Sequence, residues 1–69
     1  MRNQINVRFE EFLRRRIEKG LTLNELARRS KISSPFMSQI DRGTRHPGPK
    51  TAMKLAKALD CRFEDIFYT

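Results

Sequence analysis

The positions of glycine and proline divide this sequence into short blocks, and no other feature constrains the fold as strongly. Each block carries apolar residues at helical spacing, and no block alternates apolar and polar residues as a half-buried strand does. The sequence therefore predicts an all-α fold built from short helices, with no strand. The dividing residues are Gly20, Pro35, Gly43, Pro47, Gly48 and Pro49.

The first block predicts a helix from about Val7 to Lys19. We expect Asn6 to cap the start of this helix, and Gly20 to end it in a left-handed conformation. Its apolar stripe, with one residue at every fourth position, consists of Phe9, Leu13 and Ile17.

The second block opens with a sequence typical of a capping box, Thr22-Leu23-Asn24-Glu25. In this motif the Thr22 hydroxyl accepts a hydrogen bond from the backbone N–H of Glu25, and the Glu25 carboxylate reaches back to the backbone of Thr22. The helix is expected to end near Ser30. After the capping box, Leu26 and Ala27 are expected to face inward. Arg28 and Arg29 are expected to face solvent.

The third block predicts a helix that begins at Ser33 or Ser34 and ends at Gly43. Proline is tolerated in the first helical turn because the N–H at that position has no intrahelical partner. Since Pro35 disfavours the helical conformation in the residue before it, Ser34 is favoured as the cap. The apolar side of this helix is expected to contain Phe36, Met37 and Ile40.

A basic loop, Thr44 to Gly48, leads to a fourth helix that opens at Pro49. This helix has an apolar face (Ala52, Leu55, Ala56 and Leu59) and a basic face (Lys50, Lys54 and Lys57). A last short block, residues 63–67, is expected to pack or pair through its apolar side chains. The chain is thus expected to form a single domain over residues 1–69, a compact bundle of five short helices.

The charge balance is strongly basic. The chain has 15 Lys and Arg residues against 8 Asp and Glu residues, which gives a net charge of +7 and a pI near 10.6. So basic a domain carries the electrostatic footprint of a nucleic-acid binder, although basic charge can also simply keep a small domain soluble. One histidine, one cysteine and no convergent pair of carboxylates leave nothing to assemble into a catalytic site. We therefore expect no enzyme, no cofactor and no metal site.

The single cysteine, Cys61, excludes an intramolecular disulfide and favours a reducing setting. Cys61 itself is expected to be a small core residue. The N-terminus lacks the apolar run of a signal peptide, and nothing approaches the roughly 20 apolar residues that cross a bilayer. We expect a soluble cytoplasmic protein without a membrane partner.

Two short helices separated by a tight turn, Thr22–Ser30 and Ser34–Arg42, have the geometry of a helix-turn-helix over about residues 22–43. In this motif the second helix presents its N-terminal half to base edges in the DNA major groove. Neutral hydrogen-bonding groups lie on its outward side, on Ser34, Ser38 and Gln39. The five phenylalanines could instead stack on unpaired bases, but their helical spacing favours core or interface positions.

Four short motifs follow one another along the chain: T-x-x-E-L-A at 22–27, I-S at 32–33, S-Q-I-D-R-G at 38–43 and L-A-K-A-L at 55–59. Their order and spacing are those of one known family. Through them the chain, from Phe9 to Phe67, resembles the Cro and phage-repressor family of helix-turn-helix regulators, also called the XRE family. The resemblance implies a bundle of five helices whose third is the recognition helix. It also implies sequence-specific binding of duplex DNA and transcriptional regulation, usually repression.

Carried over position by position, the resemblance implies base contacts from Ser34, Pro35, Ser38 and Gln39. It implies phosphate contacts from Thr22, Arg42, Arg45 and His46. Lys50, near a helix start, is a further candidate for phosphate contact. The resemblance also implies a partly buried ion pair between Arg16 and Asp41, because an isolated aspartate near a core is costly unless it is paired.

The chain departs from the family pattern at three positions. Leu23 stands where the family commonly has a glutamine that clamps a phosphate, so only the backbone N–H groups of that helix start can do so here. Lys31 replaces the usual turn glycine and must adopt a left-handed or otherwise uncommon conformation. Pro35 stands where many relatives carry a polar or basic reader, and it can contact a thymine methyl group instead.

A single half-site offers few contacts, so we expect a homodimer on a near-palindromic operator whose half-sites lie roughly 34 Å apart. Phe67 and Tyr68 are the candidate interface residues, although they could also cover the core of a monomer. A bacterial or phage-type repressor of this kind would associate with the nucleoid when bound. The alternative is a protein-interaction module, such as an antitoxin-like adaptor, which an exposed Leu23 would favour.

Overall fold

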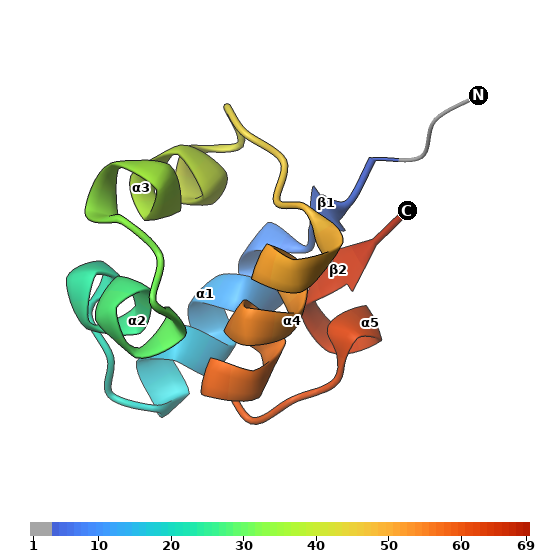
Figure 1. Cartoon of the computed structure of the whole chain (residues 1–69). Coiled ribbons are helices and arrows are strands. Elements are labelled where there is room, and N and C mark those ends of the chain that lie inside the picture. Colours follow the sequence, from blue (N-terminus) through green and yellow to red (C-terminus); the bar gives the residue numbers. More distant parts are fainter. Residues whose placement is uncertain (1–3) are drawn as a thin grey trace.

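The computed structural model describes residues 4–69, which fold into five helices and one two-stranded sheet (Figure 1). The predicted domain of residues 1–69 also includes residues 1–3, which lie outside the described residues. The expected bundle of five short helices is confirmed. In chain order the elements are β1 (Asn6–Val7), α1 (Phe9–Glu18), α2 (Leu23–Ser30), α3 (Ser34–Arg42), α4 (Pro49–Ala58), α5 (Phe63–Ile66) and β2 (Phe67–Tyr68).

The expectation of no strand is wrong at the two ends of the described chain. Strands β1 and β2 pair in antiparallel register, with Asn6 opposite Tyr68 and Val7 opposite Phe67. The pairing brings the two ends of the described chain to one side of the molecule (Figure 1). Strands of two residues are too short to show an alternating pattern, so sequence periodicity cannot reveal them.

The start of α1 differs from the prediction, whereas α2 begins as expected. Helix α1 begins at Phe9, and Asn6 does not cap it because Asn6 is held in β1. In α2 the capping box is confirmed. The backbone N–H of Glu25 donates to the Thr22 hydroxyl at 3.1 Å, and the backbone N–H of Thr22 donates to the Glu25 carboxylate at 2.8 Å.

Ser33 caps α3, so the preference for Ser34 is wrong. The backbone N–H of Phe36 donates to the Ser33 hydroxyl at 3.3 Å, and Ser34 is the first helical residue. Pro35 is therefore the second helical residue, where it is tolerated because none of the first four N–H groups of a helix has an intrahelical partner. The capping bond outweighs the tendency of Pro35 to keep Ser34 extended.

The two glycines expected to end helices both adopt the left-handed region, with φ of 72° at Gly20 and 79° at Gly43. A Cβ atom at Gly43 would lie 3.1 Å from Cζ of Phe9. Glycine at this position therefore serves two purposes, because it allows the left-handed turn and lets α1 approach the end of α3.

The core draws on every helix and on both strands. The inward positions predicted for α2, α3 and α4 are confirmed, but α1 contributes a different face. The predicted stripe of α1 is about half exposed, at 48% for Phe9, 45% for Leu13 and 60% for Ile17. The largest fully buried side chains are Phe12, Leu26, Met37, Ile40, Leu55, Ile66 and Phe67.

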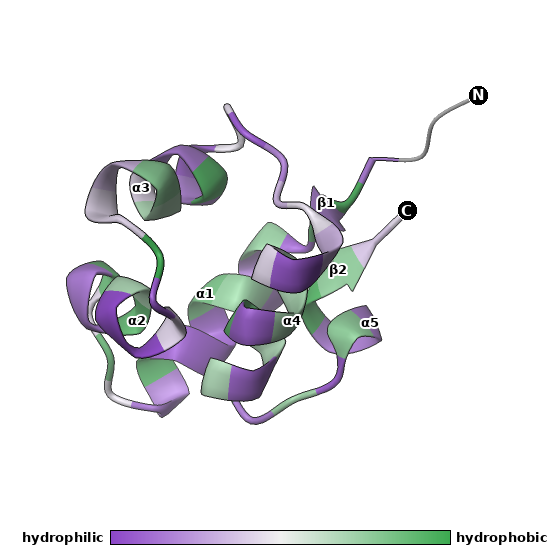
Figure 2. Cartoon of the chain, in the orientation of Figure 1, coloured by the Kyte–Doolittle hydropathy of each residue, from purple (hydrophilic) through white to green (hydrophobic). Residues whose placement is uncertain are grey.

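Hydrophobic and hydrophilic residues are interspersed along the helices, as the hydropathy colouring in Figure 2 shows. This is the pattern of helices that pack one face on a core and leave the other in water. Among residues 4–69, no helix combines the length and the apolar character needed to cross a membrane.

The capping box makes stability sensitive to acid. The backbone N–H of Thr22, and then its hydroxyl, hydrogen-bond to the Glu25 carboxylate and lower its pKa below the usual 4.5. Because the carboxylate has a lower pKa in the folded state than in the unfolded state, its hydrogen bonds stabilise the fold at pH values above the ordinary pKa. This stabilisation is lost as the pH falls through the lower, folded-state pKa. We expect the melting temperature to fall on acidification to about pH 3, and to fall less in Glu25→Gln.

Circular dichroism melts at several pH values measure this effect. Glu10→Gln is the matched control, because the Glu10 side chain makes no hydrogen bond or ion pair within the described part of the chain. Equal acid sensitivity in Glu25→Gln and the parent protein would show that the capping carboxylate does not contribute.

Candidate nucleic-acid interface

Helices α2 and α3 are connected by a turn centred on Lys31 and pack on each other. The backbone of Lys31 is left-handed, with φ of 58° and ψ of 43°, as its place in the family pattern predicts. The N–H of Ile32 donates to the Ala27 carbonyl at 2.9 Å, which closes the end of α2. Ala27 and Met37 are buried between the helices and the rest of the core, so the direction of α3 is fixed.

The four residues predicted to read bases lie in two adjacent rows on α3, because each row pairs positions four residues apart. Ser34 and Pro35 are exposed at the start of the helix, and Ser38 and Gln39 are half-buried one turn later. The carbonyl of Gln39 accepts a hydrogen bond from the N–H of Thr44 at 2.9 Å. Its side-chain amide, by contrast, makes no hydrogen bond with any residue of 4–69, so both its donor and its acceptor are available.

Two arginines lie at and just after the end of α3 and are held by local contacts. The Arg42 guanidinium donates to the Ser38 hydroxyl at 3.0 Å. The Arg45 guanidinium lies over the ring of Phe36, 5.1 Å from its centre. Neither arginine pairs with a carboxylate in the described residues, so both charges remain available for phosphate groups.

The other predicted phosphate contacts come from three different segments. The Thr22 hydroxyl accepts the capping bond from the backbone N–H of Glu25, and its proton can be donated either to the Glu25 carboxylate or to a phosphate. The exposed His46 ring lies in the loop after α3, where its Nδ1 is 3.1 Å from the Ile5 carbonyl oxygen. Lys50 is exposed in the first turn of α4.

The start of α4 adds a feature that the side-chain pattern did not single out. Gly48 occupies the cap position and Pro49 follows it, and no side chain of the described residues caps this helix. The backbone N–H groups of such a helix start can bind an anion directly. The Gly48-Pro49 sequence is the signal that could have revealed it.

The expected ion pair between Arg16 and Asp41 is wrong. None of the ion pairs found within residues 4–69 joins these two residues. The Arg16 guanidinium instead donates to the carbonyl of Leu21 at 2.9 Å, which fastens α1 to the loop before α2. Asp41 is only half-buried, so water can solvate its carboxylate without a partner.

One of the two expected interface residues is a core residue. Phe67 is fully buried within a single chain, with its ring 5.2 Å from that of Phe63. Tyr68, the next residue, is 46% exposed, and the Arg8 guanidinium lies over its ring. Tyr68 and Phe9 line the same surface hollow, so Tyr68 continues the apolar stripe of α1.

Two further expectations concern isolated side chains. Leu23 is half-buried against the core, so it does not offer the exposed side chain that would have favoured a protein-interaction module. Cys61 also packs against the core, as predicted, and burial raises the pKa of its thiol above 9.0. A protonated thiol is a poor nucleophile and metal ligand.

Comparison with known proteins places these features in a family. A helix-turn-helix family model, HTH_3, matches residues 13–66. An uncharacterised HTH-type transcriptional regulator of Sinorhizobium fredii, y4dJ, is 46% identical over 48 residues, which cover 70% of this chain and 62% of that protein. The HTH-type transcriptional repressor RghR of Bacillus subtilis is 44% identical over 54 residues, covering 77% of this chain and 40% of RghR.

A solved structure gives the same result. The restriction–modification controller protein C.AhdI of Aeromonas hydrophila superposes with a TM-score of 0.75 at 28% identity, over 81% of this chain and 85% of that chain. The two sequence relatives are longer, and this chain spans only 62% and 40% of their lengths.

The left-handed turn predicts the effect of a substitution at Lys31. A residue with a Cβ atom is strained in this conformation, whereas glycine is not. We expect Lys31→Gly to raise the free energy of unfolding by about 0.5–1 kcal/mol, after the entropic cost of glycine is subtracted. Urea denaturation measures the change.

Lys19→Gly is the control for this prediction. Lys19 also follows a helix and is also exposed, but its φ of −81° is right-handed. Glycine at position 19 should therefore leave stability unchanged or lower it. If both variants changed stability equally, the left-handed backbone at Lys31 would carry no strain.

Proposed function

Because the chain belongs to the HTH_3 family of helix-turn-helix proteins, the Cro/C1-type or XRE family, we propose that it regulates transcription by binding a specific sequence of duplex DNA. One observation carries this proposal. Helix α3 carries the side-chain amide of Gln39, which makes no hydrogen bond to any residue of 4–69, beside the exposed start of the same helix. A free amide can make two hydrogen bonds to the edge of an adenine in the major groove.

The remaining contacts divide into those that position the protein and those that read sequence. Ser34, Pro35 and Ser38 would read bases beside Gln39, with Pro35 suited to a thymine methyl group. The start of α2 and the start of α4 would bind the phosphates on either side of the groove. The side chains that add to these phosphate contacts are Thr22, Arg42, Arg45, His46 and Lys50.

We further propose that the protein acts as a homodimeric repressor on a near-palindromic operator. One copy offers few base contacts, and two copies related by a twofold axis double them. The exposed apolar surface formed by Phe9, Leu13, Ile17 and Tyr68 is suited to bury against a second copy. Repression would follow from occupancy of a promoter, in the cytoplasm and at the nucleoid.

Selection from a random library of DNA duplexes at about physiological salt tests the DNA-binding proposal. Enrichment of one near-palindromic motif is expected. Retention without enrichment would mean non-specific phosphate binding alone. No retention would overturn the proposal in favour of a protein partner.

Substitutions on α3 should separate base reading from phosphate binding. We expect Gln39→Ala to relax the preference at one base pair by about 1–3 kcal/mol. Arg42→Ala should weaken binding to all sequences alike and lower the salt dependence of log affinity by about one unit. Titration of the selected operator and its single-base variants at several salt concentrations measures both effects. A loss of specificity in Arg42→Ala would contradict this division of roles.

A charge within the apolar stripe of α1 should prevent dimer formation. We expect Leu13→Glu and Ile17→Glu to be monomeric in sedimentation equilibrium and to bind the operator at least tenfold less tightly, because a buried unpaired charge is costly. Met53→Glu is the matched control, since Met53 is 55% exposed on α4 and lies outside the stripe. A parent protein that remains monomeric both free and on the operator would contradict the homodimer.

A further inference from the structure

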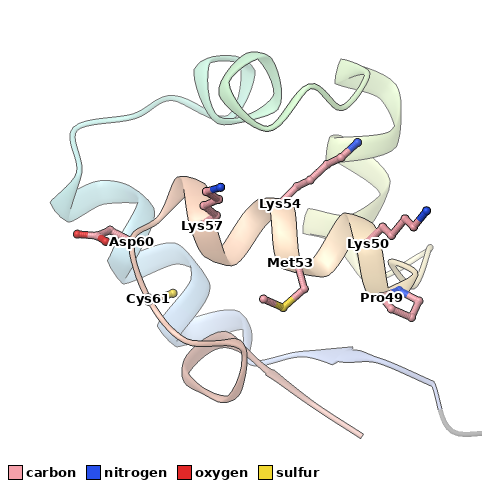
Figure 3. Close-up of a pocket in the computed structure, with 7 residues that line it drawn as sticks. All are labelled: Pro49, Lys50, Met53, Lys54, Lys57, Asp60 and Cys61. Carbon is pink, nitrogen blue, oxygen red and sulfur yellow. The ribbon is translucent and has the colours of Figure 1, made fainter.

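A small hollow between the C-terminal halves of α2 and α4 has no role in the proposed contacts with bases. It has a volume of about 280 Å³, near the lower end of the range for small-molecule sites. Six residues, here called the basic hollow, line it: Arg29, Ser30, Lys31, Lys54, Lys57 and Ala58. Figure 3 shows Lys54 and Lys57 on the side of α4 opposite to Met53.

All the charged residues of the basic hollow are cations. None of its one arginine and three lysines forms an ion pair with a carboxylate of residues 4–69. Four unpaired positive charges around one concave surface raise the local concentration of anions. Asp60, nearby at the end of α4, is paired with Lys19 and does not line the hollow.

Ser30 supplies a second and independent feature. It is the buried polar side chain of the described residues, only 3% exposed, and its hydroxyl oxygen has no hydrogen-bond partner among them. A buried hydroxyl without a partner is unfavourable, and a bound ion or water is one way in which such a group is satisfied. Ser30 lines the hollow but its hydroxyl oxygen is buried, so the side chain must turn for the hydroxyl to donate to an acceptor that enters the hollow.

We propose that the basic hollow binds a phosphate-bearing anion, with the Ser30 hydroxyl as a hydrogen-bond donor and the four cations as its charge partners. The size of the hollow suits a small group such as a diphosphate, which can come from a free phosphate compound or from the DNA backbone beyond the recognition helix. A bound anion would connect the turn at Lys31 to α4. Since that turn leads directly into α3, the anion would also steady the helix proposed to read DNA.

Inorganic pyrophosphate, titrated into the free protein at low salt, tests this proposal without DNA. Nuclear magnetic resonance should show saturable shifts at amides 29–31 and 54–58, the two segments that line the hollow. Lys54→Ala and Lys57→Ala should each weaken binding at least fivefold. Arg28→Ala is the control, because it removes a positive charge from α2 outside the hollow and has no role in the proposed DNA contacts, and it should change affinity less than twofold. Unsaturable shifts over the whole basic surface would overturn the proposal.

Ser30→Ala distinguishes a binding hydroxyl from a structural one. It should weaken pyrophosphate binding severalfold while leaving the melting temperature unchanged or higher, since it removes an unpaired buried group. A lower melting temperature together with unchanged pyrophosphate affinity would mean that the hydroxyl serves the fold alone, and would overturn its proposed role.

The two phosphate sources give different results in a DNA titration with the Lys57→Ala variant. If the DNA backbone occupies the hollow, Lys57→Ala lowers the slope of log operator affinity against log salt concentration by about one unit. If a free compound does, the salt dependence is unchanged and pyrophosphate still saturates the hollow in the protein–DNA complex. Because pyrophosphate binding is measured on free protein, failure of the DNA-binding proposal would not affect it.

Discussion

The left-handed backbone at Lys31 is the constraint on which the rest of the structure depends. It turns the chain sharply enough for α3 to cross α2, and the hydrogen bond from Ile32 to Ala27 fixes the point where α2 ends. Only then can buried residues on both helices share one core. The positions of Gln39 and Arg42 follow from this single turn, because both lie on α3 and a helix is rigid once its direction is set.

Features fixed by neighbours in the chain could be predicted from the sequence. The capping box at Thr22 depends on residues three apart, and the helix ends at Gly20 and Gly43 depend on single backbone conformations. The buried sides of α2, α3 and α4 follow from helical periodicity. The left-handed turn at Lys31 was predicted from the position of a missing glycine in the family pattern, which is also a local property.

Features that depend on distant segments could not be predicted. The repeat of Phe9, Leu13 and Ile17 is helical, but periodicity alone does not say which face of a helix meets the core. Phe67 is buried because it pairs with Val7, sixty residues earlier in the chain. The Arg16 guanidinium donates to the carbonyl of Leu21, only five residues later in the chain, and does not pair with the more distant Asp41. In the candidate interface, residue types were predictable, but the unpaired amide of Gln39 emerged only from the three-dimensional arrangement.

The pairing of β1 with β2 has a consequence for how the molecule opens and closes. It joins the two ends of the described chain, so it closes nearly the longest loop that this chain can form. Loop-closure entropy makes such contacts costly to form before the intervening helices have packed. We therefore expect the two strands to pair late in folding, after the helices between them have packed. If Val7 and Phe67 separated, the start of α1 would lose its connection to the C-terminal strand, whereas α2, the turn and α3 would stay packed.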